Sequence, residues 1–223
     1  MQTVIFSQKG TKSETNEDAC LSLASRGLFA IADGVGGGPS GEFASRAVVN
    51  TLYESFRDGA ISETAVVESI RQANAFIYEA SLSQNRKGMA STVVIGWKSD
   101  QHVMCFNVGD SRIYRVRNGV IEQLTRDQTR QVQKAPNVIK QVVTNAVGIK
   151  PSIKVEVTLH GCISGDLLLL MTDGISDPLD QDAIVRIASS SQLSLAEKAR
   201  ALVGESERRG GKDDKTVILA LMA

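Results

Sequence analysis

Two long amphipathic helices are predicted one after the other with no strand between them, and this order constrains the fold most. The first covers residues 40–57 with Ser40 as its N-cap, and the second covers residues 62–83 with Ser62 as its N-cap. In both, apolar residues recur at helical spacing and mark one face for burial. A parallel βαβ fold needs a strand after each helix, so this order favours helices packed on antiparallel sheets.

Most of the remaining chain is predicted as short strands, bounded by glycine or polar residues. The strands are 3–7, 18–24, 27–33, 90–97, 102–108, 112–116, 120–124, 153–159, 167–172 and 216–221. Asn118-Gly119 predicts a tight hairpin turn. Residues 125–150 are polar and poorly periodic, so we expect an irregular segment with at most one short helix. Two further helices are predicted over about 178–190 and 194–209.

Composition limits the class of protein. Apolar residues make up 42% of the 223 residues, and 25 basic residues balance 25 acidic ones. A neutral chain without a basic run gives no support to nucleic-acid binding. No apolar run approaches the roughly 18 residues of a membrane span. Because the chain has no repeat and no linker, we expect one domain over residues 1–223.

Cysteine and histidine content bears on compartment and metal chemistry. Three widely spaced cysteines, Cys20, Cys105 and Cys162, predict reduced thiols and a cytoplasmic protein. Residues 1–10 lack the apolar core of a secretory signal. Only two histidines are present, so a three-histidine metal site is excluded.

Acidic residues recur where the predicted strands begin or end. Asp33-Gly34 ends one apolar run and Asp173-Gly174 ends another in the same way. The other acidic residues at strand ends or in the last loop are Glu17, Asp18, Asp110, Asp213 and Asp214. Converging carboxylates repel one another unless protons or cations neutralise them. All-oxygen ligands select hard cations such as Mg²⁺, Mn²⁺ or Ca²⁺, and a neighbouring glycine can bring its carbonyl close enough to serve as a ligand.

Each of these features also has an ordinary structural interpretation. An Asp-Gly pair is most often a turn, as we expect for Asp58-Gly59, and residues 211–215 fit a charged loop. Gly36, Gly38 and Gly41 match the dinucleotide fingerprint G-x-G-x-x-G. A second helix follows where a βαβ unit needs a strand with an acidic end, which argues against nucleotide binding.

Eight motifs follow one another over about residues 10–220. They are Asn16-Glu17-Asp18, 32–37, 88–92, 107–114, 124–127, 144–148, 170–174 and 211–216. In this order they resemble the metal-dependent Ser/Thr protein phosphatases of type 2C (the PPM family), in a short bacterial form. The resemblance implies an α+β fold, a four-layer αββα sandwich of two antiparallel sheets flanked by helix pairs.

The resemblance also implies a centre with two Mn²⁺ or Mg²⁺ ions. Its ligands would be Asp33 bridging both ions, Asp173 and Asp213 on the first ion, and the Gly34 carbonyl on the second. Glu17 and Asp18 would hold metal-bound water and complete the catalytic set with Asp33. Asp110, together with Asp173, would bind a third and weaker ion.

Several positions depart from the family pattern. Ser13 stands where many relatives carry an arginine that binds substrate phosphate, and the neighbouring Lys12 is the candidate substitute. Val35 replaces the histidine proposed as general acid in eukaryotic members, and Asp214 replaces the usual asparagine. The segment 125–148 is shorter than the flap that usually borders the active site.

We therefore expect an enzyme that hydrolyses phosphoserine and phosphothreonine in proteins with a metal-bridged water. Its partners would be a phosphoprotein substrate and the Ser/Thr protein kinase system that it opposes in signalling. Two alternatives stay open at this point. One is a weak or inactive relative that acts as a regulatory binding module, and the other is a metal-dependent phosphodiesterase or nuclease.

Overall fold

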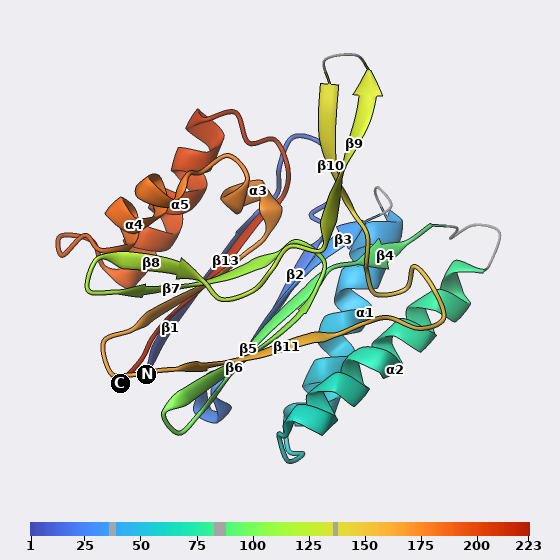
Figure 1. The fold of residues 1–223 in the computed structure, drawn as a ribbon, viewed down its shortest axis with the longest axis horizontal. Helices are drawn as coiled ribbons and strands as arrows, with labels where there is room; N and C mark the ends of the chain where they lie inside the picture. The colour runs from blue at the N-terminus through green and yellow to red at the C-terminus, as the bar shows by residue number, and fades with distance from the viewer. Residues whose placement is uncertain (36–38, 83–87, 136–137) are drawn as a thin grey trace.

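The computed structural model describes residues 1–35, 39–82, 88–135 and 138–223. Two sheets lie face to face between two layers of helices, as Figure 1 shows. One helix layer consists of α1 (Pro39–Phe56) and α2 (Glu63–Ser81). The other consists of α3 (Asp173–Ser176), α4 (Gln181–Ala188) and α5 (Leu195–Arg208). The predicted α+β sandwich is confirmed.

Every pairing among the described strands is antiparallel. The first sheet has the spatial order β1 (Gln2–Gln8), β13 (Lys215–Leu221), β12 (Leu167–Met171), β7 (Arg112–Arg117), β8 (Val120–Gln123). The second has the order β11 (Glu156–Gly161), β6 (His102–Val108), β5 (Val93–Ser99), β3 (Leu28–Val35), β2 (Asp18–Leu23), with β4 (Ala90–Ser91) beside β3. The short 3₁₀ helix Ala24–Arg26 joins β2 to β3.

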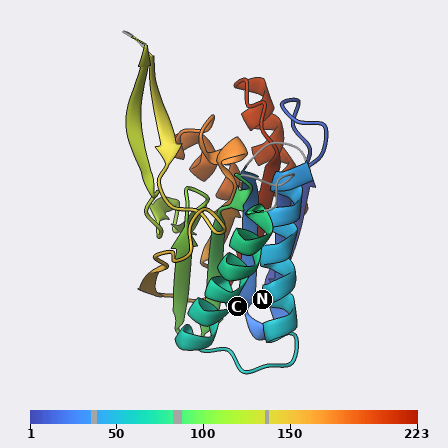
Figure 2. The same ribbon diagram turned by 90° about the vertical axis from the view of Figure 1, so that its right-hand side faces the viewer.

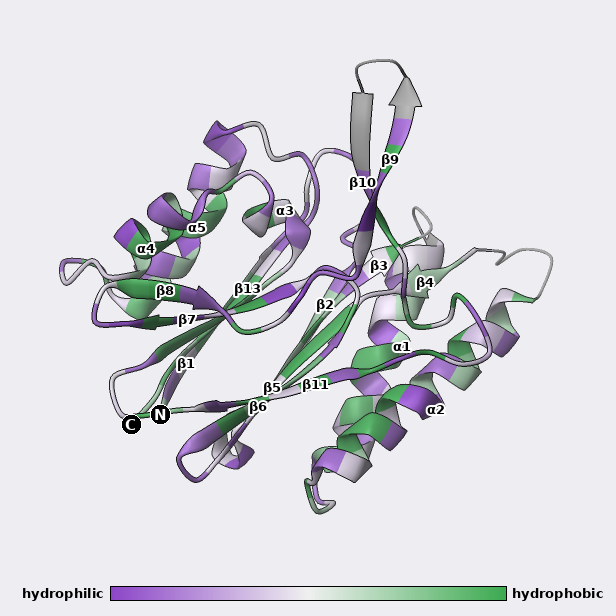
Figure 3. Cartoon of the chain, viewed as in Figure 1, coloured by the Kyte–Doolittle hydropathy of each residue, from purple (hydrophilic) through white to green (hydrophobic). Residues whose placement is uncertain are grey.

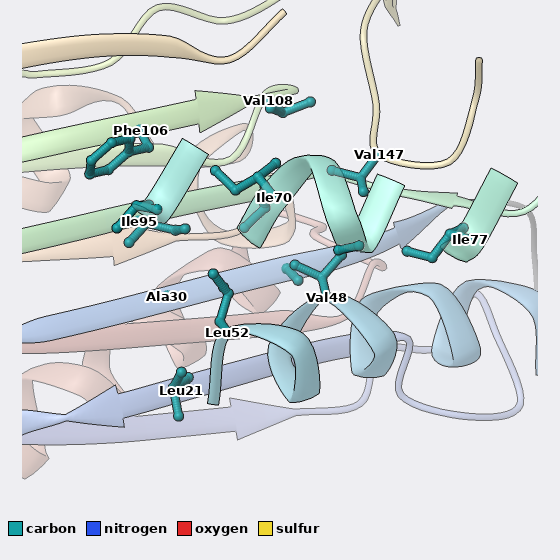
Figure 4. Close-up of a cluster of buried hydrophobic side chains, with 14 of the residues drawn as sticks. Leu21, Ala30, Val48, Leu52, Ile70, Ile77, Ile95, Phe106, Val108 and Val147 are labelled. Carbon is teal, nitrogen blue, oxygen red and sulfur yellow. The ribbon is translucent and has the colours of Figure 1, made fainter. Parts of the chain in front are cut away.

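Three apolar cores separate the four layers. The first lies between α1, α2 and the second sheet, where Leu52 and Ile70 pack near Ile95 and Phe106 (Figure 4). The second lies between the first sheet and α4 and α5, and the third lies between the two sheets. Figure 3 shows the matching pattern of hydropathy, with hydrophobic residues concentrated on the strands and on one side of α2. No helix in the described part of the chain is long and apolar enough to cross a membrane.

The strand β12 illustrates why its sequence is apolar throughout. Leu167, Leu169 and Met171 pack toward α4 and α5, whereas Leu168 and Leu170 pack between the two sheets. Because successive side chains point to opposite faces, a strand between two cores needs an apolar residue at every position.

The start of the second long helix is confirmed, but that of the first is corrected. Ser62 caps α2 by accepting a hydrogen bond from Ala65 N at 3.2 Å. The helix α1 begins at Pro39, so Ser40 lies in its first turn instead of capping it. A proline suits the first helical position because its φ angle is already helical and its missing N–H would be unpaired there.

The prediction of an irregular segment over 125–150 is wrong. The strands β9 (Thr129–Ala135) and β10 (Val138–Val143) pair with each other and stand out beyond the sandwich (Figures 1 and 2). The hairpin predicted at Asn118-Gly119 is present, with positive φ angles of 50° and 76° at its two turn residues.

Candidate metal centre

A pocket of about 580 Å³ opens at one end of the space between the sheets. Its lining brings together residues that are far apart in the sequence: Lys12, Ser13, Glu14, Thr15, Glu17, Asp33, Gly34, Val35, Thr92, Asp110, Val143, Asp173, Asp213 and Asp214. Of the predicted site residues, which are all described by the structure, only Asp18 is absent from the lining. The pocket therefore gathers carboxylates from five separate stretches of the chain.

Strand alternation explains why Asp33 and Asp18 face this space. Phe29 and Ile31 of β3 and Cys20 of β2 pack in the core between the sheets. Asp33 lies two residues after Ile31 on β3, so its side chain is on the same face of the strand. Asp18 stands directly opposite it on β2. The same strand face thus changes from apolar to acidic at the end of the sandwich.

The carboxylates of Asp18 and Asp33 are difficult to ionise together. Removal from water, with repulsion from Asp214 and Asp173, raises the pKa of Asp18 to about 7. The same loss of hydration, followed by repulsion from Asp18 and Asp173, raises the pKa of Asp33 well above its usual value. Such a pair persists only with protons or cations nearby.

The main chain of Asp33 is fixed by the last residue of β4 and the residue that follows it. Its carbonyl accepts hydrogen bonds from Thr92 N at 2.8 Å and Ser91 Oγ at 3.0 Å. Its N–H donates to Thr92 Oγ1 at 3.2 Å. Thr92 Oγ1 also lies 2.9 Å from Ser111 Oγ, next to Asp110 in the chain. These bonds join the two pocket aspartates through side chains that do not titrate.

Asp173 enters the pocket from the short helix α3, which the sequence did not predict. The preceding residue, Thr172, donates from Oγ1 to Asp18 Oδ2 at 3.1 Å, so the two acidic segments are joined directly. Burial, with repulsion from Asp213 and Asp177, raises the pKa of Asp173.

Asp110 lies in the turn between β6 and β7. Gly109 has a φ of 115°, and a Cβ there would stand 2.6 Å from Thr92 Cβ, so only glycine fits. Burial, together with Asp173, Asp177 and Asp127, raises the pKa of Asp110 to about 7.

Asp214 joins the loop before β13 to the loop after β1. It accepts hydrogen bonds from Gly10 N at 2.7 Å, Glu17 N at 2.8 Å and Ser13 Oγ at 3.3 Å. Its neighbour Asp213 accepts a charged contact from Lys12 Nζ, 2.6 Å from Oδ2. The sequence indicated the Asp213-Asp214 pair but not this division of roles.

Glycines in the site leave room for other segments more than they form sharp turns. A Cβ at Gly34 would stand 2.3 Å from Gly41 O, and one at Gly174 would stand 1.9 Å from Asp214 O. A Cβ at Gly41 would stand 2.0 Å from Glu17 Oε2. Gly41 of the apparent dinucleotide fingerprint therefore makes space for Glu17, whereas Gly36 and Gly38 lie outside the described residues.

The donor set fits a divalent metal. Asp18 Oδ1 and Asp173 Oδ1 are buried without a hydrogen-bond partner, as expected for oxygens that face a cation or a water held by one. Hard oxygen donors suit Mn²⁺ or Mg²⁺. Within the described part of the chain, however, no three His, Cys, Asp or Glu side chains form a ready-made ion cage.

Comparison with known proteins gives a consistent result. The family described as Protein phosphatase 2C matches residues 8–205. A serine/threonine phosphatase stp of Listeria monocytogenes is 28% identical over 210 residues, covering 86% of this chain and 83% of that protein. Protein phosphatase PhpP of Streptococcus pneumoniae is 27% identical over 241 residues, covering 100% and 98%.

Solved structures share the fold over nearly the whole chain. The serine/threonine phosphatase of S. agalactiae superimposes with a TM-score of 0.90 at 26% identity, covering 100% of this chain and 99% of that one. The catalytic domain of the phosphatase PstP, in complex with two manganese ions, superimposes with a TM-score of 0.84 at 26% identity, covering 99% and 97%.

Proposed function

The chain belongs to the protein phosphatase 2C family, and we propose that residues 1–223 form a single catalytic domain with its active site in the carboxylate pocket. The protein is a Mn²⁺- or Mg²⁺-dependent protein serine/threonine phosphatase with a two-ion site. Its substrates are phosphoproteins. The observation that carries the assignment of the site is the convergence of Asp33, Asp110, Asp173 and Asp213 on one pocket.

We assign the metal ligands residue by residue. Asp33 would bridge two ions, Asp173 and Asp213 would complete the first, and the Gly34 carbonyl would complete the second. Asp110 would hold a third ion with Asp173. Asp33 suits the bridging role because its main chain is fixed on both sides by Thr92. When bound, the ions supply an activated water and offset the charge that builds on the phosphoryl oxygens.

The remaining acidic residues would orient water. Glu17 lines the pocket, and its main chain is held by Asp214 and Gly34. Asp18 lies below the pocket lining with Oδ2 held by Thr172 and Oδ1 unpartnered. A fixed carboxylate with one open oxygen can accept a proton from a water and set its orientation.

Substrate phosphate would be bound by Lys12, the one cationic side chain among the described residues that line the pocket. Ser13 also lines the pocket, but its Oγ donates to Thr15 O at 2.9 Å and carries no charge. A lysine ammonium offers three rotatable donors on a flexible stem, which suits a mobile phosphoester.

The finer partner and compartment assignments are proposals. We propose that the enzyme opposes a Ser/Thr protein kinase, because removal of a phosphate has a signalling effect only where a kinase adds it. We also propose a cytoplasmic location, supported by three free cysteines, two of them buried.

Phosphate release from defined peptides tests the function. With Mn²⁺ present, we expect phosphate from phosphoserine and phosphothreonine peptides, and none after chelation with EDTA. Hydrolysis of a phosphodiester in place of these monoesters would favour the nuclease-like alternative. Saturable Mn²⁺ binding without any turnover would favour the inactive binding module instead.

A further inference from the structure

We propose that Lys12 and a divalent ion compete for Asp213, so that metal binding releases Lys12 to bind the substrate phosphate. Only the binding of the substrate phosphate by the released Lys12 rests on the proposed function. The competition itself concerns metal affinity and stands or falls without any catalytic measurement.

The contact of Lys12 places a positive charge among the proposed metal ligands. Its Nζ lies 2.6 Å from Asp213 Oδ2. The hydrogen bond to Asp213, with attraction from Asp213, Asp173 and Asp33, raises the pKa of Lys12. The ammonium is drawn to the same three carboxylates as a metal ion would be. The two cations would therefore lie close together, where their like charges repel.

The main chain of the loop that carries Lys12 is fixed by hydrogen bonds. Thr11 N and Lys12 N donate to Lys212 O at 2.8 and 3.2 Å, and Gly10 N donates to Asp214 Oδ1 at 2.7 Å. A Cβ at Gly10 would stand 2.3 Å from Lys212 O, so glycine allows this close approach. The main chain of Lys12 is thus held beside Asp213.

The side chain of Lys12 is 67% exposed and that of Asp213 is 37% exposed. An ion pair this open is weak and is screened by salt. A divalent ion bound by several carboxylates can therefore displace it. The ammonium then remains at the pocket mouth on a flexible stem, where a phosphate dianion on the ions would attract it.

Two measurements, Mn²⁺ affinity and KM, test the competition between Lys12 and the metal ion. Mn²⁺ affinity is measured by calorimetry at low ionic strength for the wild type, Lys12→Met and Lys9→Met. Lys9 is a matched control because it lies in the same loop and its Nζ donates to a backbone carbonyl, Ser13 O, at 3.1 Å. The second measurement is KM for a phosphothreonine peptide at saturating Mn²⁺.

Lys12→Met is expected to bind Mn²⁺ about twofold to fivefold more tightly than the wild type, with the difference shrinking in high salt. Its KM should rise about tenfold, and Lys9→Met should change neither value. Unchanged or weaker Mn²⁺ affinity in Lys12→Met would overturn the competition. Tighter Mn²⁺ binding with an unchanged KM would overturn the transfer to phosphate. Tighter binding in a chain without turnover would support the competition and contradict the proposed function.

Discussion

At the scale of single residues, the site is defined by like charges held against each other. Asp18 and Asp33 stand opposite each other on paired strands, and Asp173 reaches them through Thr172. Directly opposed like charges destabilise a sheet. The fold therefore sustains a local cost that bound cations would offset.

Asp33→Asn should separate activity from folding. We expect loss of phosphopeptide hydrolysis by about a thousandfold or more, because the change removes the proposed bridging ligand. In EDTA the variant should melt at a higher temperature than the wild type, because one of the repelling charges is gone. Calorimetric melting and a phosphate-release assay measure the two effects.

The control for this variant is Asp58→Asn, which changes an Asp-Gly pair whose aspartate side chain is 91% exposed. It should leave both properties unchanged. An Asp33→Asn protein that retains wild-type turnover would contradict the role of Asp33.

At the scale of elements, one arginine joins the segments behind the acidic pocket. Arg112 at the start of β7 donates from Nη2 to Asp127 Oδ2 at 2.6 Å and from Nη1 to Ser176 O at 2.9 Å. Its Nη2 also lies 2.9 Å from Asp177 Oδ1. It thereby ties the loop before β9 to the end of α3, the helix that carries Asp173.

Arg112→Lys should loosen both segments although the charge is kept. A lysine ammonium cannot reach Asp127, Ser176 and Asp177 together from fixed positions, as the planar guanidinium does. We expect a loss of about 2–3 kcal/mol in the free energy of unfolding and faster hydrogen exchange over 123–128 and 173–177. Arg71→Lys is the control, since Arg71 is 61% exposed and pairs weakly with Glu68. Equal stability of the two variants would show that Arg112 does not hold these elements.

The sequence predicted the elements that bury many apolar side chains and missed those that bury few. Long helices and core strands were predicted because their apolar periodicity reflects burial, as in β12. The pair of β9 and β10 was missed because a projecting ribbon buries little and shows no such periodicity, and residues 129–133 and 141–143 are all half-buried or exposed. The four residues of α3 are too few for a helical pattern.

At the scale of the whole molecule, the carboxylate pocket is the polar end of the core between the sheets. The convergence of Asp33, Asp110, Asp173 and Asp213 could be predicted from the sequence alone, because each stands at a strand end or in the last loop. The holding role of Asp214 and the contact of Lys12 with Asp213 could not be predicted. They depend on how the loop after β1 lies against the loop before β13, which no local pattern encodes.

The acidic pocket should make the metal-free protein less stable as pH rises. The pKa of both Asp18 and Asp110 is about 7 in the folded chain, above the ordinary value of 3.8. The folded state thus holds protons that the unfolded state has released, so the contribution is fully present below about pH 4 and is lost through about pH 7. In EDTA we expect the free energy of unfolding to fall between pH 5 and 7, by about 1.4 kcal/mol per pH unit for each such carboxyl.

Urea unfolding at a series of pH values measures this slope. Asp18→Asn should make it shallower, since one of the carboxyls with a raised pKa is removed. Saturating Mn²⁺ should flatten or reverse it, because the ions favour ionised carboxylates. A wild-type stability that rises over this range in EDTA, with the same slope in Asp18→Asn, would refute the account of the buried carboxyls.

The most direct test of the central claim is anomalous diffraction from crystals grown with Mn²⁺. The account predicts two strong manganese peaks in the pocket, about 3.5–4 Å apart, with the carboxylate of Asp33 between them and Asp173 and Asp213 on one ion. Manganese bound elsewhere, or a pocket in which Asp33 contacts no ion, would contradict it.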